Sequence, residues 1–187
     1  MSTETPSAYF EDLWKSSSDP WTHAERWYEH RKYDLTAAAL PRERYARALE
    51  PACGVGLLTR RLASRAARVE ASDRFPESVA ATSARCADVD NVTVLRRDVR
   101  EQPSGTADLV VLGEVLYYFD EPTVRRIAEL WRTACETGGH IVAVHYRPEV
   151  PQHVLTGDVV HDVLRATLGS TLTSIEDPSF LLDVFAP

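Results

Sequence analysis

The sequence predicts one α/β domain with a doubly wound, mostly parallel sheet of seven strands, and three observations predict it. The first is a length of 187 residues, which suits a single domain with a continuous core. The second is the alternation of short apolar runs with amphipathic stretches after residue 45, which is typical of strands joined by crossover helices. The third is a pair of extended runs near the C-terminal end, separated by four residues.

The apolar runs predict parallel strands, and the stretches between them predict helices. Strands are expected at residues 45–50, 69–72, 92–95, 107–112 and 140–145. Helices are expected at residues 57–66, 76–87, 122–136 and 157–168. Residues 171–186 predict a terminal antiparallel hairpin, because a turn as short as Glu176-Asp177-Pro178-Ser179 joins only antiparallel strands.

Residues 1–40 differ from the rest of the chain, because they are rich in aromatic and polar side chains. Residues 21–40 lack glycine and proline and predict a helix that ends before Pro41. We expect this N-terminal helical extension to close as a lid over a site in the core, residues 41–187. Trp21, Trp27 and Tyr28 are candidates to contact a substrate, and packing against the sheet is the ordinary structural explanation for each one alone.

The composition favours a cytoplasmic protein with a small-molecule partner. Acidic side chains outnumber basic ones by 28 to 21, for a net charge of −7, which disfavours nucleic-acid binding. No apolar run approaches the ~20 residues of a membrane span, and the first ten residues lack the features of a signal peptide. The cysteines, Cys53, Cys86 and Cys135, lack metal-site spacing, so we expect neither a zinc site nor a disulfide framework.

The segment after the first strand, E-P-A-C-G-V-G, predicts a ligand-binding turn. Gly54 and Gly56 follow Glu50 just before a helix, where glycines allow a tight turn and a close approach of the backbone to a ligand. A dinucleotide fingerprint needs a small residue where Thr59 stands. The pattern therefore favours an adenosine ligand without a pyrophosphate over a nicotinamide dinucleotide.

Acidic residues also follow the second and third strands. Asp73 lies 19 residues after Gly54, in position to accept hydrogen bonds from ribose hydroxyls. Asp98, or the backbone beside it, is placed to reach an adenine amino group, and the neighbouring Arg74 and Val99 belong to the same expected site. Each carboxylate alone is explained by a helix cap or a solvated loop, but together with Glu50 they favour a cofactor site.

These residues carry a resemblance to a known family. E-P-A-C-G-V-G, Asp73, Asp98 and D-L-V-V-L-G-E-V-L-Y-Y-F resemble the Class I S-adenosylmethionine-dependent methyltransferases. More narrowly, S-D-P-W, W-Y-E-H-R-K-Y and G-E-V-L-Y-Y-F are similar to the nodulation protein S group, which N-methylates an amino sugar in chitooligosaccharide signal molecules. The resemblance implies S-adenosylmethionine as cofactor. Ala52 departs from the usual glycine of the motif, a mild change if its backbone angles are ordinary.

The acceptor is expected at the loops after the fourth and fifth strands, where ligands bind in open α/β sheets. Methyl transfer from a sulfonium is an in-line displacement that needs alignment rather than a metal. The acceptor candidates that follow the two strands are Glu114, Tyr117, Tyr118 and His145, and the adjacent Gly113 is a candidate to bind the cofactor.

An amine acceptor would give these residues distinct roles. Glu114 can bind its ammonium form, and His145 has the pKa range of a proton acceptor. Tyr117 and Tyr118 can hold a cation against their rings. His161, in the predicted helix 157–168, is a second candidate for catalysis.

One further candidate lies in the N-terminal extension. Arg31 is expected to pair with the cofactor's carboxylate, because an arginine can bind a carboxylate with two hydrogen bonds. Lys32 competes for this role.

The leading hypothesis is therefore methyl transfer from S-adenosylmethionine to an amine on an amino sugar or a related metabolite. Two alternatives stay open: O-methylation, which needs the same alignment with a nearby base, and a non-catalytic nucleotide- or partner-binding domain of the same fold. A nicotinamide oxidoreductase is disfavoured by Thr59 and by the terminal hairpin. The sequence does not indicate an oligomeric state.

Overall fold

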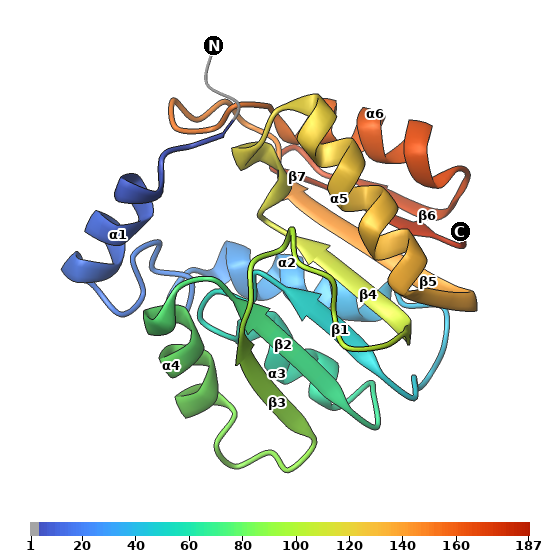
Figure 1. Cartoon of the computed structure of the whole chain (residues 1–187), viewed down its shortest axis with the longest axis horizontal. Helices are drawn as coiled ribbons and strands as arrows, with labels where there is room; N and C mark the ends of the chain where they lie inside the picture. Colours follow the sequence, from blue (N-terminus) through green and yellow to red (C-terminus); the bar gives the residue numbers. More distant parts are fainter. Residues whose placement is uncertain (1–3) are drawn as a thin grey trace. The chain divides into compact units, whose positions relative to one another are not determined.

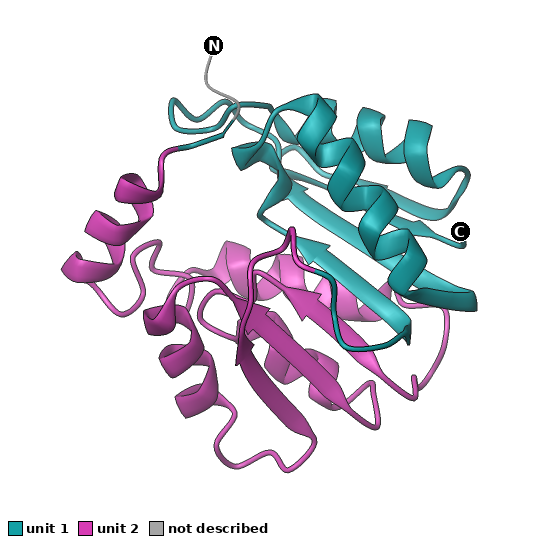
Figure 2. Ribbon diagram, viewed as in Figure 1, with its two compact units in different colours: residues 1–5, 102–187 teal, residues 6–101 magenta. Residues whose placement is uncertain are grey.

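A computed structural model describes residues 4–187 (Figure 1). The first three residues of the predicted N-terminal extension lie outside the described residues. The chain divides into two compact units (Figure 2), one of residues 6–101 and one of residues 102–187 with residues 4 and 5. The organisation as a single domain with residues 1–40 as a lid stays a prediction.

The unit of residues 6–101 contains three parallel strands in the order β3-β2-β1. The strands are β1 (Ala48–Pro51), β2 (Val69–Asp73) and β3 (Val92–Arg96). The helices are α1 (Ser7–Ser16), α2 (Trp27–Ala38), α3 (Leu57–Ala63) and α4 (Pro76–Arg85). All four residues of β1 are buried, as expected for a parallel strand covered on both faces.

The unit of residues 102–187 contains four strands in the order β4-β5-β7-β6. The elements are β4 (Ala107–Gly113), a 3-10 turn η1 (Leu116–Tyr118), α5 (Glu121–Ala134), β5 (Cys135–Tyr146), α6 (Gly157–Leu168), β6 (Thr171–Glu176) and β7 (Phe180–Phe185). β4 and β5 are parallel, whereas β7 is antiparallel to both β5 and β6. The predicted terminal hairpin is therefore confirmed.

The structure differs from the sequence-based expectation at several element boundaries. α3 ends at Ala63 and α4 at Arg85, rather than at residues 66 and 87, and β1 begins at Ala48 and β5 at Cys135, rather than at residues 45 and 140.

Two further differences, at residues 21–26 and at the end of α5, have a local cause. Residues 21–26 form turns rather than the first part of a helix, because the Asp19 carboxylate accepts hydrogen bonds from the amides of His23 and Ala24 at 3.0 and 2.8 Å. At the other boundary, α5 ends at Ala134, because Cys135 is extended and pairs with Ala107. The segment before residue 17 also contains a separate helix, α1, that had no prediction of its own.

Capping residues explain where α5 and α6 begin. The Asp120 carboxylate accepts the amide hydrogen of Thr123, and the Thr156 hydroxyl accepts that of Val159. The two helices pack side by side in Figure 1. No helix within residues 4–187 has the length and apolar character needed to cross a membrane.

The start of α6 leaves no space for a side chain at Gly157. A Cβ built there would overlap the carbonyl oxygen of Tyr146 and lie 3.0 Å from its carbonyl carbon. Backbone atoms cannot move aside to relieve this overlap, whereas the end of a flexible side chain can. The glycine therefore allows α6 to begin against the end of β5.

We predict that Gly157→Ala lowers the free energy of unfolding by about 1–3 kcal/mol, the usual cost of overpacking. Urea denaturation followed by circular dichroism measures this change. Asp162→Ala on the same helix is the matched control, since its exposed ion pair with Arg165 (3.6 Å) contributes under about 1 kcal/mol. Equal losses of stability in the two variants would contradict the close approach of Gly157 to the Tyr146 carbonyl.

Candidate active site

Three residues of the turn between β1 and α3 adopt left-handed backbone conformations. Ala52, Gly54 and Gly56 have φ angles of 57°, 58° and 77°. This conformation costs a residue with a Cβ roughly 1–2 kcal/mol. The backbone angles of Ala52 are therefore not ordinary, and its replacement of the usual motif glycine is not the mild change that we expected. A Cβ at Gly56 would lie 2.9 Å from Thr82 Cγ2, whereas a Cβ at Gly54 would meet nothing within 4 Å. The turn is therefore packed on the Gly56 side and has open space at Gly54.

The neighbouring strand and helix fix the carbonyl and the amide of Gly54. Its amide donates to Asp73 Oδ2 at 3.1 Å. Its carbonyl accepts hydrogen bonds from the Ser78 and Thr82 hydroxyls at 2.6 and 2.8 Å. Sequence reasoning missed Ser78 and Thr82, although their spacing of four residues in a predicted helix would have placed two hydroxyls on one face.

Asp73 ends β2 with capacity for further hydrogen bonds. Oδ1 accepts the amide hydrogen of Phe75 at 3.0 Å, and Oδ2 accepts that of Gly54. Burial raises the pKa of this carboxyl above its ordinary value, against the opposing effect of these hydrogen bonds. An ionised carboxylate has about four acceptor positions, so Asp73 can also accept the hydroxyls of a ribose.

Glu50 places a carboxyl group with an unsatisfied oxygen in β1. The residue is 4% exposed, and Oε2 has no hydrogen-bond partner among the described residues. Burial raises the pKa of this carboxyl to about 8, with a further contribution from the charge of Asp73. A donor or a cation from a ligand would satisfy Oε2, which fits the ammonium group of an amino-acid cofactor.

Arg74 and Asp98 lie at the ends of β2 and β3, as the sequence predicted. The Asp98 carboxylate accepts the Arg100 guanidinium at 2.8 Å and lies 3.7 Å from the Arg74 guanidinium. Burial opposes ionisation of Asp98, but the hydrogen bonds from Arg100 outweigh it and lower its pKa. The adjacent Val99 is buried. Asp98 is therefore charged and oriented at the strand end.

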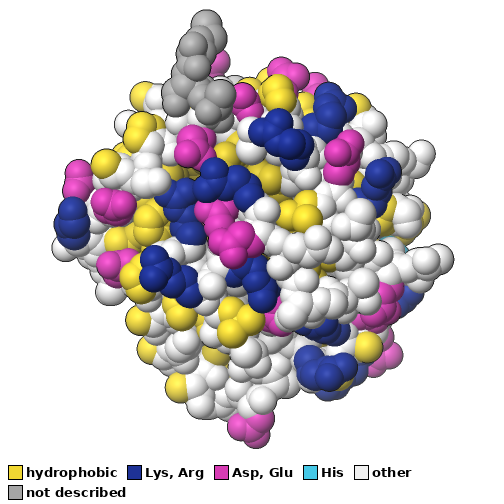
Figure 3. Space-filling view, in the orientation of Figure 1, with side chains coloured by type: hydrophobic (Ala, Val, Ile, Leu, Met, Phe, Trp, Pro, Cys, Tyr) yellow, Lys and Arg dark blue, Asp and Glu magenta, His cyan; other side chains and the backbone are white. Residues whose placement is uncertain are grey.

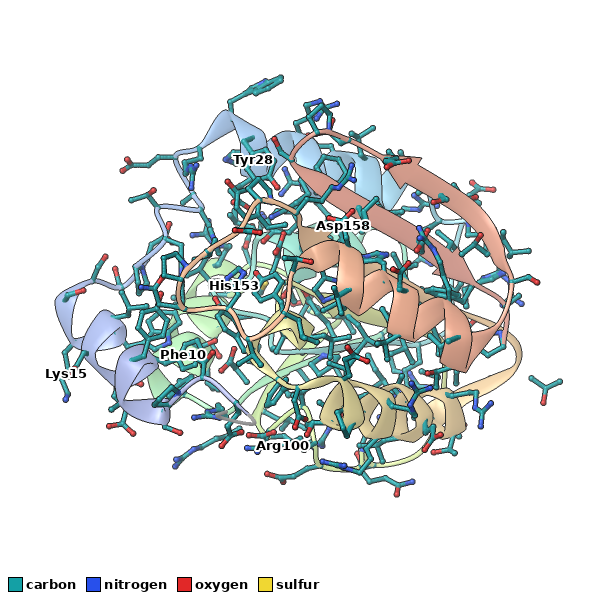
Figure 4. The ribbon with its side chains drawn as sticks, turned by 90° about the horizontal axis from the view of Figure 1, so that it is seen from above. Phe10, Lys15, Tyr28, Arg100, His153 and Asp158 are labelled. Atoms are coloured by element: carbon teal, nitrogen blue, oxygen red, sulfur yellow. The ribbon has the colours of Figure 1, made fainter. Side chains whose placement is uncertain are left out.

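α1 lies against the same strand ends. Arg74 sits over the rings of Phe10 and Phe75 at 5.8 and 4.7 Å and hydrogen-bonds Ser7 Oγ. Figure 4 labels Phe10 and Lys15 on this helix. A cavity of about 710 Å³ is lined by residues of α1, of the β2–α4 turn and of the end of β3, including Lys15, Arg74 and Asp98. Figure 3 shows acidic and basic side chains next to one another on the displayed face.

The candidates in α2 and before it have different surroundings. The Lys32 ammonium is buried and pairs with Glu29 at 2.6 Å, which makes Arg31 the better candidate to bind a carboxylate. Arg31 lies over the Trp27 ring at 5.9 Å.

The aromatic candidates of this region also differ from one another. Trp27 is 74% exposed, Trp21 packs on Trp14, and Tyr28 contacts Lys32. Substrate contacts by these aromatic residues stay predictions.

Glu114 follows β4 in a left-handed conformation, with φ of 54°. Its amide donates to the carbonyl of Val144 at 2.9 Å. Its carboxylate Oε2 accepts the Tyr117 hydroxyl at 2.6 Å and the Tyr146 amide at 3.0 Å. Gly113, the last residue of β4, pairs with Val144 in the ladder. These contacts fix the carboxylate at the carboxyl ends of β4 and β5.

A histidine that sequence reasoning left without a role lies beside this carboxylate. The His153 ring stacks on the Tyr117 ring at 3.8 Å, and the Tyr118 ring meets Tyr117 edge-on at 4.7 Å. Burial lowers the pKa of His153 to about 4, against the opposing charge of Glu114. The imidazole is therefore neutral at neutral pH. His153 belongs to the irregular segment between β5 and α6 (Figure 4), and no sequence signal marks it.

The other two histidine candidates, His145 and His161, lie together and have no exposed surface. His145 Nδ1 and His161 Nε2 are 3.2 Å apart, and His161 Nδ1 is 2.7 Å from Asp183 Oδ2. Sequence reasoning missed Asp183, although a single carboxylate inside the apolar run F-L-L-D-V-F was a signal. Within residues 4–187, no group of three or more histidine, cysteine or acidic side chains could hold a metal ion.

Comparison with known proteins yields a consistent set of similarities. A family model described as a methyltransferase domain matches residues 48–139. A candidate methyltransferase of solved structure from Pseudomonas syringae is 35% identical, with a TM-score of 0.77, over 87% of this chain and all of that one. The N-methyltransferase NodS from Bradyrhizobium japonicum, solved with S-adenosylhomocysteine, has a TM-score of 0.81 at 23% identity, over 95% of this chain and 96% of that one.

Curated relatives point in the same direction. Nodulation protein S of Rhizobium tropici is 30% identical over 68% of this chain and 55% of that protein. Nodulation protein S of Sinorhizobium fredii is 29% identical over 60% of this chain and 53% of that protein. The chain thus spans about half the length of the curated relatives it matches.

We predict that Glu50→Gln stabilises the ligand-free protein at alkaline pH. A carboxyl whose pKa rises from 4.5 to about 8 on folding loses stabilising free energy as the pH increases through that window. The gain of the variant at pH 8.5 has an upper limit of about 5 kcal/mol. Urea denaturation at pH 5, 7 and 8.5 measures it.

Glu70→Gln is the matched control with the opposite sign. Burial opposes ionisation of Glu70, but hydrogen bonds from Arg97 and Arg47 outweigh it and lower the pKa. Its ionised form therefore stabilises the folded state above the ordinary carboxyl pKa, and this variant is expected to be less stable at pH 7. If the changes in the free energy of unfolding of the two variants depended on pH in the same way, the raised pKa of Glu50 would be contradicted.

Proposed function

Because the chain belongs to the Class I S-adenosylmethionine-dependent methyltransferases, as its sequence resemblance indicated, we propose that it transfers a methyl group from this cofactor to an amine of a small molecule, an amino sugar or a related metabolite. The observation that carries the choice of an amine is the Glu114 carboxylate. The Tyr117 hydroxyl and the Tyr146 amide orient this carboxylate at the end of β4. A fixed negative charge favours an acceptor that arrives as a cation.

The glycine turn and the strand ends β1 to β3 supply the proposed cofactor contacts. Asp73 accepts the ribose hydroxyls, and Asp98 with the Val99 backbone binds the adenine edge. Glu50 Oε2 faces the ammonium group, and Arg31 binds the carboxylate. The open space at Gly54 allows the ligand to approach the backbone. The bound cofactor supplies an electrophilic methyl group.

The proposed acceptor contacts come from the ends of β4 and β5. Glu114 binds the ammonium form and orients it, and the rings of Tyr117 and Tyr118 restrict its position. The ammonium first loses a proton to solvent water, because the lone pair of the nitrogen must be free to attack. The methyl carbon then forms a bond to nitrogen as its bond to sulfur breaks, and the product is a methylammonium and S-adenosylhomocysteine. The chain's part is to hold the nitrogen in line and to exclude water.

Two further features support a small-molecule role in the cytoplasm. The net charge of −7 disfavours a polyanionic substrate. The spacing of Cys53, Cys86 and Cys135 does not suggest a disulfide framework, which favours a reducing compartment.

The cofactor half is tested by isothermal titration with S-adenosylhomocysteine. We expect micromolar binding, no binding of NADH, and a loss of about 10- to 100-fold in Asp73→Ala, since hydrogen bonds to a charged group are worth about 1.5–3 kcal/mol. Asp88→Ala is the control, because its exposed pair with Arg60 lies outside the site. Unchanged affinity in Asp73→Ala would rule out the ribose contact.

The acceptor half is tested by methyl transfer to a chitooligosaccharide with a free terminal amine, with the fully N-acetylated oligosaccharide as the matched substrate. We expect N-methylation of the free amine only. Glu114→Gln should lower kcat/KM about 100-fold through loss of a fixed charge and its alignment, and Tyr117→Phe should lower it less. Methylation of hydroxyls would favour the O-methyltransferase alternative. Cofactor binding without transfer to either class of acceptor would favour a binding domain.

A further inference from the structure

A row of three polar side chains with no exposed surface crosses β5, α6 and β7, and the proposed chemistry does not use it. The row consists of His145, His161 and Asp183. At one end, His145 Nε2 lies 3.4 Å from the backbone nitrogen of Leu116, the first residue of η1. At the other end, Asp183 Oδ1 accepts a hydrogen bond from Arg165 Nη2 at 3.2 Å, and Asp183 Oδ2 forms an ion pair with Arg165 Nε at 2.9 Å.

The direction of every hydrogen bond in the row follows from the Leu116 amide, which can only donate. His145 Nε2 must therefore accept, so the His145 proton is on Nδ1. That proton is donated to His161 Nε2 at 3.2 Å, so the His161 proton is on Nδ1 as well. His161 then donates to Asp183 Oδ2 at 2.7 Å. A backbone amide and a carboxylate thus fix the tautomers of both imidazoles.

The state of Asp183 agrees with this direction. Burial opposes its ionisation, but hydrogen bonds from His161, Ser174 and Arg165 outweigh that effect and lower its pKa to about 2. The carboxylate at the end of the row is therefore an acceptor at any pH at which the protein would be assayed.

We propose that His145, His161 and Asp183 are positioning residues that hold the backbone of η1, and through it the acceptor-binding side chains Tyr117 and Glu114. This assignment of a role in the reaction rests on the proposed function. Leu116 directly precedes Tyr117, whose hydroxyl binds Glu114. The row thereby connects the terminal strand pair to the site at the end of β4.

The same geometry argues against direct proton transfer by these histidines. Each ring nitrogen that faces along the row already donates or accepts, and neither ring has exposed surface. The row also ends at an amide nitrogen, which has no lone pair available for a proton. Its effect on the reaction is therefore through position, and not through acid–base exchange with an acceptor.

The first experiment measures the tautomers in the full chain. Long-range ¹H–¹⁵N correlation spectra of histidine-labelled protein distinguish Nδ1–H from Nε2–H imidazole. Single-histidine substitutions assign the signals. We expect Nδ1–H for both His145 and His161. An Nε2–H form of either ring in the wild-type protein would overturn the proposal, whatever the outcome of the methyl-transfer assay.

Two substitutions at the central position separate hydrogen bonding from volume. His161→Phe removes both the acceptor and the donor, whereas His161→Gln can accept from His145 and donate to Asp183. We expect His161→Phe to leave the His145 Nδ1 proton without its acceptor, to loosen the contact of His145 with the Leu116 amide, and to lower kcat about 10- to 100-fold. Its affinity for S-adenosylhomocysteine should stay the same, and His161→Gln should restore most of kcat. Equal impairment of the two variants, or unchanged kcat in His161→Phe, would overturn the role.

A variant of the end residue keeps the proposal testable if His161→Phe does not fold. Asp183→Asn retains an oxygen that can accept the His161 proton but removes the charge that faces Arg165. We expect lower stability with both Nδ1–H tautomers retained and kcat within about threefold of wild type, because alignment rather than charge sets the rate. A shift of His161 to Nε2–H in this variant would contradict the proposal. If the wild-type protein shows both Nδ1–H tautomers but transfers no methyl group to amines, the result contradicts the proposed function and leaves the role of the row in place.

Discussion

Strands that are buried on both faces have room for polar side chains mainly where they end, and this constraint determines where the chemistry of this chain can lie. β4 is buried through Leu112, and the polar residue Glu114 follows directly after it. In β2 the buried run ends at Asp73. Since parallel strands carry their carboxyl ends to the same edge, the burial that stabilises each unit also places its polar groups together.

Each unit holds a strained residue at one of its strand ends. Ala52 and Glu114 have positive φ angles of 57° and 54°, a conformation that costs free energy in residues with a Cβ. Hydrogen bonds to neighbouring strands offset part of this cost: the Glu114 amide is bound by Val144, and its carboxylate by the Tyr146 amide. The strain is therefore maintained by backbone groups of the sheet, which a loop without such neighbours could not provide.

Much of this architecture could be predicted from sequence, because hydrophobic periodicity and turn length are local signals. Residues 157–168 and the terminal hairpin were predictable on that basis. The helix over residues 21–26 was not, since its replacement by turns depends on the Asp19 side chain capturing two amides. His153 and Asp183 were missed for a different reason. Their partners Tyr117 and His161 lie 36 and 22 residues away in the chain, so the contacts leave no periodic trace. Only the interruption of the apolar run F-L-L-D-V-F marks Asp183 in the sequence.

The buried carboxyl of Glu50 also has a calorimetric consequence. With a pKa of about 8, this group is mostly protonated at neutral pH in the ligand-free protein. A cation bound at the unsatisfied oxygen of Glu50 favours the ionised carboxylate, so the carboxyl proton dissociates. Binding is then coupled to the release of a proton into the solvent, and the observed heat includes the protonation enthalpy of the buffer. The apparent affinity of the ligand rises with pH up to about 8 for the same reason.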